Sequence, residues 1–225
     1  MKNYYKLFFL YSKDKLLCAL ILATILIIIF FPLLTGNVLL PLDILNQLYY
    51  PYFGSEIINN PQVQNHYVHD SIRFYYPGKL FLKYCIETNQ SIFWNPFIFS
   101  GYAFYAYSTS AIYDLFNIFL LFMDTPNAVA IGVILQLFMA GFSMYLLMRK
   151  YNISLYGSLI SAIGYMLNGM FIVTIYHEWI IGAFCWLPLI ILMLEHWFDK
   201  QKTSYYFFTI IFFSLSHLGG NLQVS

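Results

Sequence analysis

Charged residues are scarce in this chain of 225 residues, since Asp, Glu, Lys and Arg make up only 9% of it whereas 60% is hydrophobic. A soluble domain carries about 25% charged residues because its surface must face water. Ten acidic and eleven basic residues cannot cover a globule of this size, so we expect lipid to cover much of it. The formal net charge is +1 and no basic run occurs, which predicts no nucleic-acid partner.

Cysteine is also scarce and scattered. Cys18 and Cys185 lie inside apolar runs and Cys85 lies between them. An odd, dispersed set predicts neither a disulfide framework nor a metal cluster, so we interpret all three as packing residues. The sequence contains no His-x3-His or Cys-x2-Cys spacing, and a structural zinc site is therefore unsupported.

A signal-peptide cleavage site is missing as well. The first apolar run, Leu16–Leu34, is longer than the hydrophobic region of a usual signal peptide, and no small-x-small motif follows it. We therefore expect this run to be retained as a first transmembrane helix.

Long uncharged apolar runs are what the sequence has in abundance. About 20 apolar residues cross the hydrocarbon core as a helix, and solid apolar runs lack the alternation of a β-barrel strand. The sequence therefore predicts an all-α integral membrane protein of about five transmembrane helices, at residues 16–34, 126–148, 153–176, 179–194 and 203–218.

The run Ala111–Met123 is a shorter sixth candidate, which carries Asp114 and Asn117 and would rise only about 20 Å as a helix. With five spans, the lysines before the first span share the cytoplasmic side with later basic residues, as the positive-inside rule requires. A sixth crossing would move those later residues outside: Arg149, Lys150, Lys200 and Lys202. We therefore predict a cytoplasmic N-terminus and interpret Ala111–Met123 as an interfacial or re-entrant helix.

This topology places positions 36–125 in one large external loop of short interfacial helices after the first span. Loops of this length usually carry function. We treat residues 1–225 as a single membrane domain. The sequence closes on a polar turn directly after the fifth span, so we predict that it is the N-terminal part of a longer protein.

Two aspartates in this loop stand before similar segments. Asp43 is followed by a stretch that ends in Tyr-Tyr-Pro51, and Asp70 by one that ends in Tyr-Tyr-Pro77. Asp43 lies close to the predicted membrane surface, where a carboxylate can serve chemistry. The alternative is that both aspartates are N-caps of short helices, a position that Asp favours.

Basic and aromatic residues supply further candidates. Arg73 and Lys79 are suited to meet a lipid phosphate, although Lys79 also begins a four-residue spacing that is typical of an amphipathic helix lying hydrated on the membrane. Trp94 and Asn95, ahead of Gly101, form an aromatic turn that is either a binding element or part of an interfacial aromatic belt.

His177 and Glu178 lie in the predicted outer turn between the third and fourth spans. They are candidates for ligands or proton carriers above the membrane, and the alternative is an ordinary hydrated turn. This set of residues has no metal-ligand spacing, so the metal content stays open.

Taken in order, these residues resemble the YfhO family of bacterial membrane proteins, a branch of the GT-C glycosyltransferase superfamily. Many relatives carry a proline shortly after the glycine that corresponds to Gly101, whereas Tyr102 and Ala103 follow it here, and family proteins are considerably longer. The matching features are Asp43 with Gln47 and Pro51, Asp70 with Tyr76-Pro77, Trp94-Asn95-Pro96 with Gly101, Met139-Ala140-Gly141 with Tyr145 and Arg149, Asn168-Gly169-Met170, Trp186-Leu187-Pro188, and Gly219-Gly220 with Gln223.

The resemblance implies a GT-C enzyme in the bacterial cytoplasmic (inner) membrane, which transfers a sugar from a polyprenyl-phosphate carrier to an external acceptor such as a cell-envelope glycopolymer. By position, Asp43 is then the essential acid of the first external loop and Asp70 the second. Asp43 would act as a general base or hold a divalent cation. Arg73 and Lys79 become the candidates for binding the carrier phosphate.

Two other functions compete with this one. A transporter or flippase for a lipid-linked glycan would want ionisable residues at mid-membrane depth, and the predicted spans contain none apart from His217 near an edge. A non-catalytic membrane subunit or remnant is the other alternative.

Overall fold

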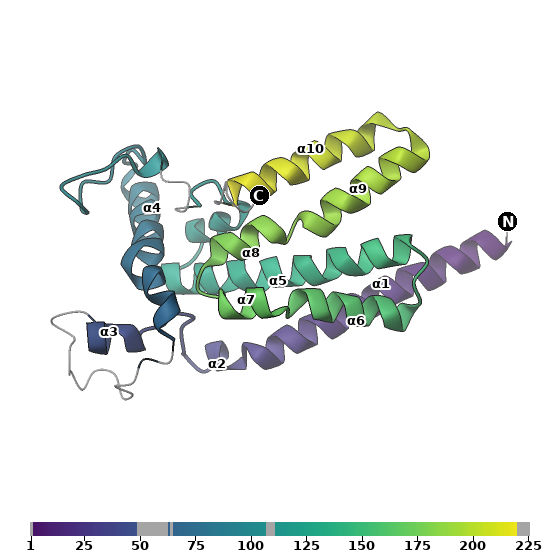
Figure 1. The fold of residues 1–225 in the computed structure, drawn as a ribbon, viewed down its shortest axis with the longest axis horizontal. Helices are drawn as coiled ribbons and strands as arrows, with labels where there is room; N and C mark the ends of the chain where they lie inside the picture. The colour runs from purple at the N-terminus through teal and green to yellow at the C-terminus, as the bar shows by residue number, and fades with distance from the viewer. Residues whose placement is uncertain (1, 49–62, 64, 107–110, 220–225) are drawn as a thin grey trace.

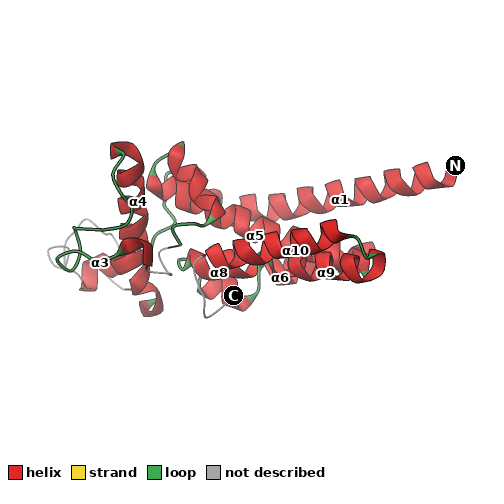
Figure 2. Cartoon of the chain, turned by 90° about the horizontal axis from the view of Figure 1, so that it is seen from above, coloured by secondary structure: helices red, strands yellow, loops and turns green. Residues whose placement is uncertain are grey.

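The computed structural model describes residues 2–48, 63, 65–106 and 111–219, and within these ranges it is built from helices (Figures 1 and 2). The β pairing seen there is one bridge between Asn95 and Tyr102. The predicted all-α fold is therefore confirmed. In chain order, the helices are α1 (Lys2–Ile29), α2 (Phe31–Leu34), α3 (Asp43–Leu48), η1 (His66–Val68), η2 (Ser71–Tyr75), α4 (Tyr76–Thr88), η3 (Phe104–Ala106), η5 (Leu115–Leu121), α5 (Thr125–Lys150), α6 (Leu155–Met166), α7 (Gly169–Val173), α8 (Glu178–Phe184), α9 (Leu187–Lys200) and α10 (Thr203–Leu218).

The long helices form a bundle around α5, which contacts α1, α6, α8 and α9 (Figure 1). The core contains fully buried side chains from several helices, among them Leu22, Leu137 and Ile181. Gly141 lets α1 and α6 approach α5, because a Cβ atom there would lie 3.0 Å from the Cβ of Met166 on α6 and 3.3 Å from Cδ1 of Leu22 on α1. Small residues at such contacts are typical of packed helices in membranes, where close backbone approach replaces hydrophobic burial as the driving force.

Three described segments are long and apolar enough to cross a membrane: Thr125–Lys150, Leu155–Val173 and Glu178–Lys200. They coincide with the predicted second, third and fourth spans. α1 and α10 occupy the positions predicted for the first and fifth spans, and the total of five spans stays a prediction. Two of the three segments are interrupted, since α6 is followed by α7 and α8 by α9 within them.

Charged side chains tie the helix ends together at the end of the bundle that lies away from α4 (Figure 1). Arg149 pairs with Asp14 at 3.4 Å, which joins α5 to α1, and Lys150 pairs with Asp199 at the end of α9. These contacts gather residues that the charge distribution assigned to the cytoplasmic side.

The described part of the predicted external loop lies at the opposite end of the bundle, and α4 runs across the bundle axis in both views (Figures 1 and 2). This direction agrees with a helix that lies along a membrane surface. Leu80 and Tyr84 are exposed on it, as expected, but Lys79 is 4% exposed. The expectation of a hydrated Lys79 is therefore wrong, because Lys79 pairs with Glu178 on α8.

The aromatic turn after α4 is a compact local structure. Asn95 is buried, exchanges two backbone hydrogen bonds with Tyr102, and accepts a third from the backbone N–H of Phe97 through its side chain. Gly101 has φ +102° and lies under the Trp94 ring, where a Cβ atom would come within 2.5 Å of that ring. Only glycine fits both the backbone conformation and the space, so this motif has a structural explanation.

The arrangement predicts the side of the membrane that each end faces. We expect Lys150→Cys to be labelled by an impermeant maleimide only in inside-out vesicles, because positive residues stay cytoplasmic. Glu87→Cys, at an exposed position of α4, is the matched control and should be labelled only in right-side-out vesicles. Labelling of both positions from one side would contradict the five-span topology.

Candidate functional site

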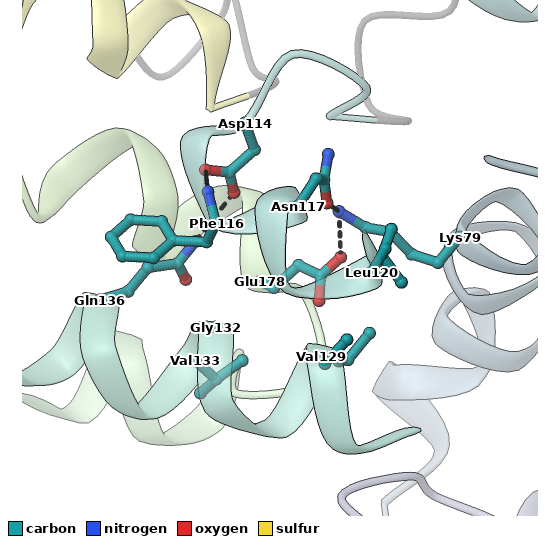
Figure 3. Close-up of a pocket in the computed structure, with 11 residues that line it drawn as sticks. Lys79, Asp114, Phe116, Asn117, Leu120, Val129, Gly132, Val133, Gln136 and Glu178 are labelled. Atoms are coloured by element: carbon teal, nitrogen blue, oxygen red, sulfur yellow. Dashed lines mark hydrogen bonds and ion pairs between the residues drawn. The ribbon is translucent and has the colours of Figure 1, made fainter. Parts of the chain in front are cut away.

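A buried ion pair joins the loop to the bundle. The Nζ atom of Lys79 on α4 lies 2.9 Å from Oε1 of Glu178, the first residue of α8 (Figure 3). Lys79 also donates a hydrogen bond of 2.5 Å to Oδ1 of Asn117 on η5. The two charged side chains are only 5% and 11% exposed. Buried charges need both an opposite charge and hydrogen-bond partners, and this arrangement supplies them.

The side chain of Asn117 is held in place by hydrogen bonds to two backbone carbonyl groups. Its Nδ2 atom donates to the carbonyl oxygens of Ala111 and Ile112, at 2.6 and 2.9 Å. This orientation leaves the amide oxygen facing Lys79. Three elements that are distant in sequence, α4, η5 and α8, therefore meet at one ammonium group.

A second buried acid lies on the other side of η5. Asp114 accepts hydrogen bonds from Nε2 of Gln136 on α5, at 2.9 Å, and from the backbone N–H of Phe116, at 3.1 Å. Gln136 is the twelfth residue of α5, so Asp114 reaches about 17 Å along that helix. The segment expected to be interfacial or re-entrant thus packs along the outer part of α5.

Glycine makes room for this second acid. A Cβ atom at Gly182 on α8 would lie 3.0 Å from Nε2 of Gln136 and 3.3 Å from Oδ2 of Asp114. Gly219, one of the glycines in the family resemblance, packs against the backbone of Gly182 in turn, where a Cβ atom would come within 2.8 Å. Both glycines are explained by close packing of backbone.

Burial raises the pKa of Asp114 to about 6. The charge of Lys79 and the two hydrogen bonds oppose this rise, while the charge of Glu178 adds to it. A cavity of about 10 Å³, room for one water, lies between Asp114 and the Lys79–Glu178 pair. The Oε1 atom of Gln136, which lines this cavity, is buried without a hydrogen-bond partner.

The turn at residues 176–177, directly before Glu178, interacts with the part of the loop that carries the predicted catalytic residues. The hydroxyl of Ser71 donates a 2.8 Å hydrogen bond to the carbonyl oxygen of Tyr176, which ties η2 to this turn. Burial raises the pKa of Tyr176, and the nearby charge of Asp43 raises it further. Burial lowers the pKa of His177, against an opposing effect of the Asp70 charge. Asp43 and Asp70 therefore both act electrostatically on residues 176–177.

The predicted site residues differ in exposure. Asp70 lies 3.3 Å from Nε2 of His69, with both side chains about two-fifths exposed, and makes no N-cap hydrogen bond. Asp43 is the first residue of α3. Arg73 is exposed, with its guanidinium 5.2 Å from the centre of the Phe74 ring. The Tyr-Tyr-Pro51 segment lies outside the described residues.

His177 is buried beneath aromatic rings. Tyr67 and Tyr75 meet it edge-on, with ring centres 5.7 and 5.2 Å away, and its Nε2 atom is buried without a hydrogen-bond partner. Trp94 and Asn95 belong to the separate aromatic turn after α4 and have no described hydrogen bond to the 176–178 turn. Within the described residues, no group of three or more His, Cys, Asp or Glu side chains could hold a metal ion.

Three polar residues of the site escaped sequence reasoning as site members: Asp114, Asn117 and Gln136. The signal was present in part, because Asp114 and Asn117 interrupt an apolar run with a three-residue spacing. Their side-chain partners, however, are Gln136 on α5 and Lys79 on α4, and no local pattern identifies these contacts.

The apolar bundle, its spanning-length helices and the polar loop side define the class: this is a helical membrane protein that associates with the lipid bilayer. The sequence matches the family described as bacterial membrane protein YfhO over residues 58–216. That match covers more than half of the chain, so the protein belongs to this family, and the resemblance drawn from its motifs is confirmed. Searches of curated proteins and of solved structures found no match.

The two ion pairs made by lysines of α4, Lys79–Glu178 and Lys83–Glu87, should contribute very differently to the stability of the protein. Glu178→Gln should lower the stability of the protein by about 3 kcal/mol, because it leaves the Lys79 charge buried without its counter-charge. Glu87→Gln is the matched control: Glu87 pairs with Lys83 at 3.2 Å but is 60% exposed, so its loss should cost about 0.5 kcal/mol or less. Thermal unfolding of the purified protein in detergent measures both.

A double variant checks the interpretation of this pair. Lys79→Met combined with Glu178→Met should destabilise less than the sum of the two single changes, since no unpaired charge remains. Additive losses would show that the two side chains do not stabilise each other.

Asp114 predicts a dependence of stability on pH. Because its pKa is raised on folding, the folded protein binds this proton more tightly, and the resulting stability is lost as the pH rises from about 4 to about 6. Asp114→Asn imitates the protonated acid, so it should raise the melting temperature near neutral pH, and the gain should shrink toward zero at about pH 4. Asp124→Asn, at an exposed carboxylate, should show no such trend. A gain for Asp114→Asn that is the same at every pH would contradict the raised pKa.

Proposed function

We propose that this protein is a GT-C-type membrane glycosyltransferase, which transfers a sugar from a polyprenyl-phosphate carrier to an acceptor outside the cytoplasmic membrane. The observation that supports the proposal is the hydrogen bond from the Ser71 hydroxyl to the carbonyl oxygen of Tyr176, which ties η2 to the 176–178 turn. Besides burial, the charge of Asp43 raises the pKa of Tyr176, and the charge of Asp70 opposes the lowering of the His177 pKa by burial. Membership of the YfhO family supports it. Nucleotide sugars are cytoplasmic, so an external transferase needs a donor that is delivered by a lipid.

Asp43 is the proposed catalytic residue. It begins α3 at the loop end of the bundle, and its charge acts on Tyr176. In this position the Asp43 carboxylate would take the proton from the acceptor hydroxyl while the hydroxyl oxygen attacks the anomeric carbon of the sugar. The bond between that carbon and the carrier phosphate breaks at the same time, and the polyprenyl phosphate leaves. The alternative role of Asp43 is to hold a divalent cation, which would offset the charge of the departing phosphate.

The cations of the loop take different roles in this proposal. Arg73 is exposed on η2, and its planar guanidinium is suited to bind the carrier phosphate through two hydrogen bonds. Lys79 is committed to Glu178 and Asn117, so we assign it a positioning role. It holds the 176–178 turn against α4 and thereby fixes that turn relative to the loop.

Asp43→Asn tests the proposal directly. This change keeps the size of the side chain and removes its charge and basicity, so transfer from a polyprenyl-phosphate sugar should fall by about 100-fold or more in membranes that carry the variant. Asp124→Asn, another external aspartate in the predicted topology, should keep the wild-type rate. The protein level in the membrane is measured alongside, and wild-type transfer by Asp43→Asn would refute the assignment.

A further inference from the structure

Two of the predicted spans are broken at the same place in the bundle. α6 ends at Met166 and α7 begins at Gly169, while α8 ends at Phe184 and α9 begins at Leu187. The two breaks face each other, because the hydroxyl of Tyr165 donates a 3.0 Å hydrogen bond to the carbonyl oxygen of Phe184. Irregular backbone inside a membrane is tolerated where it is buried or lines a cavity, and paired breaks often mark a binding site.

A groove of about 530 Å³ lies at these breaks. It is lined by Met144 on α5 and by residues of the segments around each break. The groove is open at Gly164, where an added Cβ atom would meet no other atom within 4 Å.

The polar groups of the groove are already satisfied within the protein. Ser161 donates to the carbonyl oxygen of Gly157 at 2.9 Å, and Tyr165 donates to Phe184. Asn168 donates to the carbonyl oxygen of Tyr165 at 2.7 Å and accepts from the backbone N–H of Phe171 at 3.0 Å. An occupant therefore needs no hydrogen-bonding groups, and hydrocarbon fits the remaining methionine and aromatic surface. Methionine adapts readily to irregular, branched shapes.

The groove is connected to the 176–178 turn by the helices on either side of that turn, α7 and α8. Its lining includes Met170 and Phe171 on α7, and the chain leaves α7 at Val173 and reaches Tyr176 three residues later. α8 descends from Glu178 to Phe184 on the other side. A hydrocarbon chain lying in the groove would thus bring an attached polar head to the 176–178 turn.

We infer that this groove binds the polyprenyl chain of the lipid-linked substrate, with the phosphate and sugar held above it at the 176–178 turn. The inference rests on the proposed function for the identity of the head group. It adds a binding site within the membrane, formed by the breaks between α6 and α7 and between α8 and α9.

Photo-crosslinking tests the groove without any need for transfer. The intact protein is reconstituted with a polyprenyl phosphate that carries a diazirine on its chain, and with a phospholipid that carries the same group on an acyl chain. We expect the polyprenyl probe to label peptides that contain Met144 and Met170, and Gly164→Phe to lower that labelling by about tenfold because the new ring fills the groove. Ile160→Phe, at a 72% exposed position one turn away on α6, should leave labelling unchanged.

The outcomes separate this inference from the proposed function. Equal labelling of the groove by the phospholipid probe, or labelling that Gly164→Phe does not reduce in a protein of unchanged melting temperature, would overturn the groove as a polyprenyl site. Asp43→Asn should keep full labelling, since that residue acts on the sugar. Specific labelling in a wild-type protein that transfers no sugar would preserve the groove and refute the transferase.

Discussion

The buried contact between Lys79 and Glu178 is the interaction on which the rest of the site depends. It joins α4, which crosses the end of the bundle, to the first residue of α8, and the amide of Asn117 adds η5 to the same point. Removing two charges from water is costly, and their mutual attraction offsets that cost only in good geometry. The loop is therefore docked in one orientation, which sets where the 176–178 turn lies relative to Asp43 and Asp70.

The segment from 111 to 123 shows how a polar sequence is accommodated against an apolar bundle. Its polar side chains Asp114 and Asn117 find partners on two helices, Gln136 on α5 and Lys79 on α4. Gly182 on α8 leaves the space in which the first pair fits. Because each group is paired, the segment can lie along α5 without leaving a bare charge. A raised pKa at Asp114 remains as the cost of this burial.

The motifs of the sequence divide into those explained by packing and those that point to chemistry. Gly101 beneath Trp94, Gly141 between α1, α5 and α6, and Gly219 against Gly182 are all positions where only a small residue fits. Asp43 and Arg73 lie on the loop helices α3 and η2, and Asp70 directly precedes η2. This division supports placing chemistry at the loop end and lipid binding in the bundle.

The sequence by itself determined the class of protein, its family and the positions of its apolar helices, because those follow from long uncharged runs and from ordered local motifs. The helix breaks at 167–168 and 185–186, the burial of Lys79 and the roles of Asp114 and Gln136 were decided only by the tertiary structure. Each depends on a contact between residues far apart in the chain, and Lys79 in particular reads as a hydrated surface lysine until Glu178, almost a hundred positions later, is folded against it.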